Sequence, residues 1–189
     1  MRFNSLRIFF PGCLLVAFFL ISLSNCAPKS LMTNGGFEIG RFDGWQVETC
    51  NQGFVGITDE HSHSGKKALK LAAIDKADDI RVMQEISVEP DCYYRFSGYI
   101  KAEGVEKTSV GGNLSIANCF DHSGNVCGDT GWKYIKMYFK TGRDVHKIVL
   151  AARLGMFCNI VRGTCYFDDL KVVKIKFTPK EYFMVEPGL

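Results

Sequence analysis

Short segments in which apolar and polar residues alternate recur along much of the chain. From Tyr94 to Ile100, for example, every second residue faces one apolar side, and Arg95, Ser97 and Tyr99 fall on the other. A period of two is typical of strands that have one face in a hydrophobic core. The pattern predicts eight strands: 54–58, 68–73, 80–88, 92–102, 110–118, 132–140, 146–154 and 164–175.

Turn residues separate these runs, and no segment shows a convincing helical period. The turn signals are Asn34-Gly35-Gly36, Ser64-Gly65, Glu89-Pro90-Asp91, Gly111-Gly112 and Gly142. Many short, regularly spaced strands predict an all-β fold, either a sandwich or a barrel. The segment 177–189 contains two prolines and is predicted to be a C-terminal tail packed by Tyr182 and Phe183.

The first 26 residues have the plan of a secretory signal peptide. A positive start precedes an apolar run from Cys13 to Ile21, and small polar residues follow. A membrane anchor is the alternative, although the run is short for a spanning helix. No second run of spanning length occurs, so the rest of the chain is expected to be soluble after a short linker, 27–30.

The cleavage point leaves two possibilities open. Leu23 to Cys26 resembles a bacterial lipobox, in which Cys26 would carry the lipid, but Asn25 departs from that pattern. Lipidation would tether the protein to the cell envelope without spanning the membrane. Ordinary cleavage near Ala27 would release a secreted protein instead.

Charge argues against a nucleic-acid ligand. The 189 residues include 23 Lys plus Arg and 20 Asp plus Glu, for a net charge of +3. Without Arg2 and Arg7 of the leader, 21 basic residues face 20 acidic ones. No basic stripe remains along the sequence to drive phosphate binding.

Eight cysteines occur, and six lie outside the leader: Cys50, Cys92, Cys119, Cys127, Cys158 and Cys165. An even number in an exported chain predicts three disulfides, for which fifteen pairings are possible. Local spacing favours Cys119 with Cys127 and Cys158 with Cys165, which leaves Cys50 with Cys92. No C-x-x-C pair suggests zinc.

Five motifs in order resemble the CenC-like carbohydrate-binding modules, which are galactose-binding-like jelly rolls. They are LMTNGGFEIGRFDGWQV (31–47), HSGKKALKL (63–71), MQEISVEPDCYYRFSGYIKAE (83–103), DTGWKYIKMYFKTG (129–142) and GTCYFDDLKVVKI (163–175). The resemblance spans residues 31–176 and implies a jelly-roll β-sandwich of two antiparallel sheets. Trp45 and Trp132 are expected in its core.

The resemblance also implies a structural calcium ion. Modules of this type often hold calcium between the NGGFE turn, the HSGK turn and the first aspartate of the DD pair. The corresponding ligands would be the side chains of Glu38 and Asp168 and the backbone carbonyl of Lys66, since calcium prefers oxygen donors. The alternative is that both carboxylates cap turns or pair with lysines. His61 and His63 are expected to be solvated turn residues.

In the resembled family the ligand groove is the concave face of one sheet. Saccharides are bound by aromatic rings and by polar side chains that reach their hydroxyl groups. The residues that the period of two leaves outside the core, and that we predict to bind the ligand, are Tyr99, Tyr138, Arg153, Tyr134 and Arg95. Lys136, Gln84 and Asn118 are further candidates.

No catalytic motif is present. The chain has no G-x-S-x-G elbow, phosphate loop or H-E-x-x-H. Asp168 and Asp169 are adjacent in a predicted strand, so they are expected to point to opposite faces and not to flank one glycosidic bond. We therefore expect a non-catalytic exported protein that binds a poly- or oligosaccharide. The alternative is an envelope lipoprotein that uses the sandwich for protein contacts or adhesion.

Overall fold

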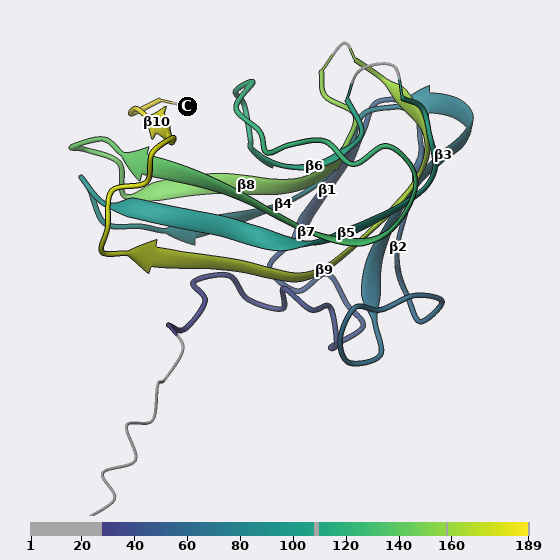
Figure 1. Ribbon diagram of the computed structural model, residues 1–189, viewed down its shortest axis with the longest axis horizontal. Coiled ribbons are helices and arrows are strands. Elements are labelled where there is room, and N and C mark those ends of the chain that lie inside the picture. The colour runs from purple at the N-terminus through teal and green to yellow at the C-terminus, as the bar shows by residue number, and fades with distance from the viewer. Residues whose placement is uncertain (1–27, 108–109, 158, 189) are drawn as a thin grey trace, which may run out of the picture.

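The computed structural model describes residues 28–107, 110–157 and 159–188, and the chain is a β-sandwich (Figure 1). Its strands are β1 (Gln46–Thr49), β2 (Phe54–Thr58), β3 (Ala68–Asp78), β4 (Ile80–Ser87), β5 (Tyr93–Val105), β6 (Gly112–Ile116), β7 (Gly128–Thr141), β8 (Lys147–Leu154), β9 (Val161–Ile175) and β10 (Phe183–Val185). Within the described ranges there is no helix that is long and apolar enough to span a membrane.

The strands form two sheets. The small sheet has the order β1-β4-β8-β6, and the large sheet has the order β10-β7-β5-β9-β3-β2. Neighbouring strands are antiparallel except for β10, which pairs in parallel with β7. The expected all-β jelly-roll sandwich is therefore confirmed.

All eight predicted strands occur. The alternation located β2 at its observed bounds, whereas β3, β5, β7 and β9 are longer than predicted. Two strands were not predicted. One is β1, whose four residues are all exposed, and the other is β10, which lies in the segment interpreted as a tail.

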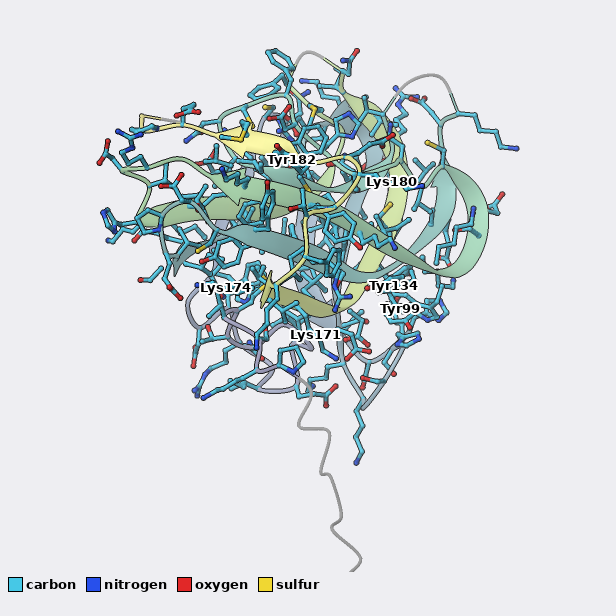
Figure 2. The ribbon with its side chains drawn as sticks, turned by 60° about the vertical axis from the view of Figure 1, so that its left-hand side comes forward. Tyr99, Tyr134, Lys171, Lys174, Lys180 and Tyr182 are labelled. Atoms are coloured by element: carbon cyan, nitrogen blue, oxygen red, sulfur yellow. The ribbon has the colours of Figure 1, made fainter. Side chains whose placement is uncertain are left out.

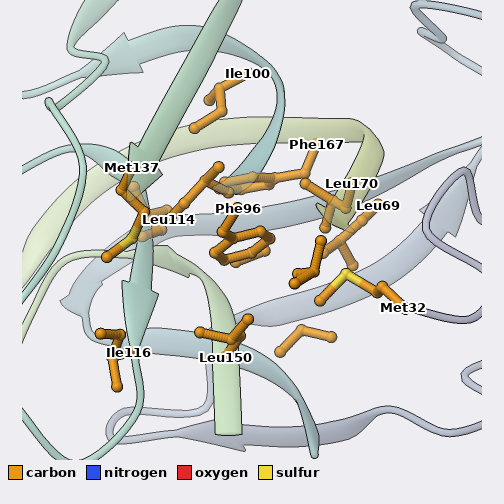
Figure 3. Packing of buried hydrophobic residues seen from close by; sticks show 14 of the residues in the cluster. Met32, Leu69, Phe96, Ile100, Leu114, Ile116, Met137, Leu150, Phe167 and Leu170 are labelled. Carbon is orange, nitrogen blue, oxygen red and sulfur yellow. The ribbon is translucent and has the colours of Figure 1, made fainter. Parts of the chain in front are cut away.

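The core lies between the two sheets. Phe96 and Phe167 from the large sheet face Leu114 and Leu150 from the small sheet, and Met32 closes one end (Figure 3). Trp45 belongs to this core, as predicted. Trp132 does not, because it is only partly buried and contacts His63 edge to face with 5.9 Å between ring centroids.

The N-terminal segment is bound to β9, far away in the sequence. Leu31 N donates to Val172 O at 2.8 Å, and Leu170 N donates to Gly35 O at 2.9 Å. A Cβ atom at Gly35 would collide with the carbonyl of Leu170, so this approach requires glycine. The NGG turn is thus a docking point for the start of the chain.

The C-terminal segment crosses from β9 to the far side of β7. Tyr182 contacts Tyr93 edge to face at 5.1 Å, and Phe183 packs against the core, as the sequence predicted for both. The sandwich therefore extends beyond residue 176, and treating 177–189 as a tail only was wrong.

Two of the favoured disulfide pairings do not fit the fold. The five described cysteines all have free thiols. Cys50 and Cys92 lie beyond opposite ends of β4, roughly 20 Å apart, whereas a disulfide needs Cα atoms within about 7 Å. Cys119 lies in the turn of a hairpin that pairs Gly112 with Val126, so Cys127 is roughly 15–20 Å away at the open end. Cys158 lies outside the described residues, as do Cys26 and the leader.

Candidate functional site

Four of the five predicted ligand residues lie together on the outer face of the large sheet. Residues directly opposite each other in antiparallel strands point to the same face. Tyr99 in β5 is opposite Tyr134 in β7, and Arg95 is opposite Tyr138. Figure 2 shows Tyr99 and Tyr134 next to each other on this surface. We call it the large-sheet face.

The aromatic part of this face is built around Tyr99. The rings of Tyr99 and Tyr134 are 5.3 Å apart and tilted by 56°. His63 stacks on Tyr99 at 3.4 Å, and its Nδ1 lies 2.8 Å from Asp169 Oδ2. His63 is an exposed residue of a bend, as the sequence predicted, but its ring also has these two partners. Because His63 covers one side of Tyr99, Tyr134 offers the more accessible ring, with 48% of its surface exposed.

A row of cations lies beside these rings. Lys136 in β7 and Lys171 in β9 are both opposite Ser97 of β5, so their Cα atoms are about 10 Å apart. Arg95 is two residues away from Ser97 on the same face, and its Nε is buried without a hydrogen-bond partner. Among the described residues, no acidic group forms an ion pair with any of these three cations. Sequence reasoning missed Lys171, because the bulge in β9 shifts the alternation.

The other end of the face contains a balanced charge network. Lys70 Nζ lies 2.6 Å from Glu60 Oε2, Lys101 pairs with Glu103, and the Tyr166 hydroxyl lies 3.3 Å from Glu60 and 3.2 Å from Glu103. Burial and the charge of Glu103 raise the pKa of Tyr166. The lysines lower the pKa values of Glu60 and Glu103. His61 remains partly exposed between β2 and β3 and joins this network through Glu103 at 3.1 Å.

A groove borders the large-sheet face along β7. Its volume is about 630 Å³, and its walls come from the hairpin near His122, from β7 and from the C-terminal segment. Lys136 and Tyr138 line it from the sheet, while Lys180 and Glu181 line it from the C-terminal segment. Phe177 contacts Tyr138 edge to face at 6.2 Å.

Arg153 does not belong to this face, and its prediction as a ligand residue is contradicted. It lies in β8 of the small sheet with no exposed surface. Its Nε donates to Asp79 Oδ1 at 2.6 Å, and Nη2 pairs with the second oxygen of Asp79. The Phe157 ring lies 4.4 Å from its Cζ. The alternation placed Arg153 outside the core correctly, but other segments cover that position.

The outer face of the small sheet holds further covered polar groups. Asn113, opposite Arg153, has no exposed surface, and its Nδ2 donates to Gly111 O and Gly155 O. The N-x-S sequence at this position is therefore inaccessible to a glycosylating enzyme in the folded protein. Gln84 was a candidate for ligand contact, but it is buried and exchanges hydrogen bonds with the backbone of Thr33.

The sequence predicted that Asp168 and Asp169 point to opposite faces of the sheet. In the structure both carboxylates point toward the same loop. Asp168 Oδ2 accepts hydrogen bonds from the amides of His63 at 2.8 Å and Ser64 at 3.0 Å. The Ser64 hydroxyl donates to Asp169 Oδ1 at 2.9 Å. Asp169 has a φ of 53°, next to a register shift in β9, and this turns both carboxylates toward the same loop.

The predicted calcium ligands gather at the same loop. Glu38 Oε1 accepts the amides of Lys66 at 2.9 Å and Lys67 at 3.0 Å, which lower the pKa of Glu38. Burial raises the pKa of Asp168 despite its amide hydrogen bonds. A Cβ atom at Gly36 would lie 3.6 Å from Asp168 Oδ1, so the glycine leaves space beside that oxygen.

The oxygen atoms of Glu38, Asp168 and Lys66 are of the chemical type that calcium prefers, but their arrangement is not that of a metal site. Two carboxylates and nearby backbone carbonyls are suitable ligands. However, the described residues contain no group of three His, Cys, Asp or Glu side chains that could hold a metal ion. The observed hydrogen bonds are those of turn-capping carboxylates, which is the alternative that the sequence left open.

Comparison with known proteins gives the family. The family model for the carbohydrate binding domain matches residues 29–156. Exochitinase 1 of Streptomyces olivaceoviridis is 28% identical over 154 residues, and the match covers 82% of this chain but only 23% of the chitinase. The chain thus spans less than a quarter of that enzyme.

Solved structures share the fold. TmCBM61 in complex with β-1,4-galactotriose has a TM-score of 0.54 and 18% identity, and the match covers 78% of this chain and 99% of that chain. The CBM22-1 xylan-binding domain of Paenibacillus barcinonensis Xyn10C has a TM-score of 0.51 and 17% identity, over 80% of this chain and 98% of that one. With the family match over most of the sequence, the protein is a member of the carbohydrate binding domain family.

Proposed function

We propose that this protein is a non-catalytic carbohydrate-binding protein and that its saccharide lies on the large-sheet face. The observation that carries the proposal is the pair Tyr99 and Tyr134, with an exposed ring beside hydrogen-bond donors. A sugar ring packs its CH groups against an aromatic face, and neighbouring polar side chains bind its hydroxyl groups. Lys136 and Lys171 supply such donors within one row of the tyrosines.

The related proteins support the class of ligand. One structural neighbour is a complex with β-1,4-galactotriose, another is a xylan-binding domain, and the sequence relative is a chitinase. These names define the first panel of probes for this chain: galactan, xylan and chitin oligosaccharides.

The test is binding of these saccharides to wild-type protein and to two variants. Tyr134→Ala removes the accessible ring and should weaken binding about tenfold or more, since exposed aromatic anchors dominate such contacts. Phe120→Ala is the matched control, because Phe120 is 75% exposed and its ring contacts Phe157, with 4.7 Å between centroids, rather than Tyr99 or Tyr134.

The two variants separate the outcomes. Loss of binding in Tyr134→Ala alone supports the large-sheet face. Loss in Phe120→Ala alone moves the site to the hairpin between β6 and β7 and contradicts the proposed location on Tyr99 and Tyr134. Absence of saccharide binding by folded wild-type protein contradicts the function itself.

Export and anchoring belong to the same proposal. The leader in residues 1–26 supports secretion, and Cys26 supports a lipid anchor in the cell envelope. The intact mass of the mature protein decides this point. A mass increment of a diacylglyceryl group on a chain starting at Cys26 supports the anchor, and an unmodified chain starting near Ala27 contradicts it.

A further inference from the structure

The charges of the large-sheet face are distributed unevenly. At one end Lys70 and Lys101 have carboxylate partners. At the other end Lys140, which is opposite Tyr93, lies 3.9 Å from Asp91. Between these two ends the cations have no acidic partner in the described part of the chain.

The cations without an acidic partner are Arg95, Lys136 and Lys171, of which Lys136 has its Nζ 5.7 Å from the centroid of the Tyr138 ring. They occupy adjacent rows of β5, β7 and β9, so like charges are held within about 10 Å of one another. Like charges at this distance repel each other, and the repulsion is only partly screened at physiological salt. The fold places an acid beside most of the other lysines of this face but none here.

The environment of Arg95 is a second, independent indication that this face binds an anionic group. Its Nε is buried and has no hydrogen-bond partner, which is costly for a charged group. Phe177 lies over the neighbouring Tyr138, so this region is partly shielded from solvent. A guanidinium in such a place is well suited to an anionic oxygen, because its N–H groups bind carboxylates in a fixed geometry.

The groove along β7 extends this positive surface. Lys136 lines both the groove and the large-sheet face, and Lys180 faces it from the C-terminal segment. Glu181 is the one carboxylate among the residues that line the groove in the described structure, and it lies next to Lys180 in sequence. Figure 2 shows Lys171 on the sheet and Lys180 on the C-terminal segment of this side of the molecule.

From these observations we infer that the ligand is a negatively charged saccharide, such as a polymer of uronic acid. This inference rests on the proposed function and specifies its ligand class. The tyrosines bind the sugar ring, and Lys136, Lys171 and Arg95 bind the carboxylates. Each saccharide unit thereby offers one apolar surface and one anion to a face that has rings and unpaired cations side by side.

The experiment compares two forms of one polymer. Polygalacturonate carries a carboxylate on each residue, and its fully methyl-esterified form has the same backbone without the charge. We expect wild-type protein to bind polygalacturonate at least about tenfold more tightly, with an affinity that falls as salt rises to about 0.5 M. Neutral β-1,4-galactan and single-stranded polyuridylate complete the panel.

Charge variants identify the residues. Lys136→Gln combined with Lys171→Gln should lower the affinity for polygalacturonate about tenfold and reduce its salt dependence, while the affinity for the ester falls much less, because glutamine still donates hydrogen bonds to hydroxyl groups. Lys133→Gln is the matched control. Lys133 is also an exposed lysine of β7, but it is opposite Ile100 and therefore does not belong to the large-sheet face.

Each outcome has one meaning. Equal affinity for acid and ester, or binding of galactan alone, overturns the charge inference and leaves the proposed function in place. Binding of polyuridylate but of no saccharide overturns both and indicates a nucleic-acid surface. Binding of no saccharide at all contradicts the proposed function. An effect of Lys133→Gln as large as that of the double variant contradicts the assignment to the central row.

Discussion

The two outer faces of this sandwich differ although their strands look alike in sequence. Both β5 and β8 alternate an apolar side with a side that carries an arginine. Arg95 stays on a partly open surface among tyrosines and lysines, whereas Arg153 is covered and bound to Asp79. Removal of one partner from a buried ion pair destabilises the fold, because the other charge is left uncompensated, while cations without an acidic partner on an open face are available to a ligand.

The largest expected change in the free energy of unfolding comes from Arg153, on the outer side of the small sheet. Arg153→Ala should lower the free energy of unfolding by about 3–5 kcal/mol, because it leaves Asp79 buried without its partner. Arg95→Met, on the large-sheet face, should change it by about 1 kcal/mol or less. Urea unfolding of both variants measures the difference. Similar losses in the two variants would contradict the distinction between the two faces.

The second effect concerns the loop that Asp168 caps. Asp168→Ala leaves three backbone amides without their acceptor and should cost about 2–3 kcal/mol of unfolding free energy. The same loop tests the calcium ion that the family resemblance implies. If calcium binds there, a chelator should lower the melting temperature of wild-type protein by about 5 °C and leave that of Asp168→Ala unchanged.

The control for this loop is Asp129, which caps Gly104 N at 2.7 Å in an exposed position away from the loop. Asp129→Ala should keep any response of the wild type to chelator. If the wild type itself does not respond, calcium is contradicted, and Glu38 and Asp168 serve only as caps.

The third effect is a pH dependence from the balanced end of the large-sheet face. The pKa values of Glu60 and Glu103 are lowered by Lys70 and Lys101 in the folded state, below an ordinary value of 4.5. The stability that they contribute is therefore present above that pH and is lost as pH falls through the folded values. Glu60→Gln with Glu103→Gln should flatten the thermal stability profile below pH 4.5. If the variant loses stability below pH 4.5 as steeply as the wild type, the ion pairs of Glu60 and Glu103 do not contribute to stability.

The smallest expected change in stability comes from Lys136 and Lys171, the lysines without an acidic partner on the large-sheet face. Lys136→Gln with Lys171→Gln should leave the unfolding free energy unchanged or raise it by about 0.5 kcal/mol at low salt, because like-charge repulsion is relieved. The gain should disappear at about 0.5 M salt. A clear loss of stability would mean that intramolecular contacts of these lysines, such as that of Lys136 with the Tyr138 ring, outweigh the repulsion, and it would contradict the difference between the two faces.

The period of two predicted the sandwich and its large-sheet face because burial on one side of a strand leaves a direct trace in sequence. Tyr99, Tyr134, Tyr138 and Arg95 were grouped correctly for this reason. The short β1 and β10 left no such trace, since β1 is exposed throughout and β10 depends on its pairing with β7.

The errors have a common physical origin. Parity assigns a side chain to a face but does not tell which segments cover that face, so Arg153 was misplaced. Local spacing does not give hairpin geometry, and the hairpin that pairs Gly112 with Val126 separates Cys119 from Cys127. A bulge resets the alternation, which turned Asp169 toward His63 and brought Lys171 onto the large-sheet face.

The docking of the N-terminal segment on β9 has a consequence for how the chain acquires its structure during synthesis. Leu31 and Gly35 bond to residues that are translated about 140 positions later. At roughly 5–20 residues per second, a ribosome needs about 7–28 seconds to cover that distance. Until then the first segment has no partner strand, so the sandwich closes only after β9 has emerged. Contacts between such distant parts of a sequence also slow folding, since a long loop must be ordered before they form.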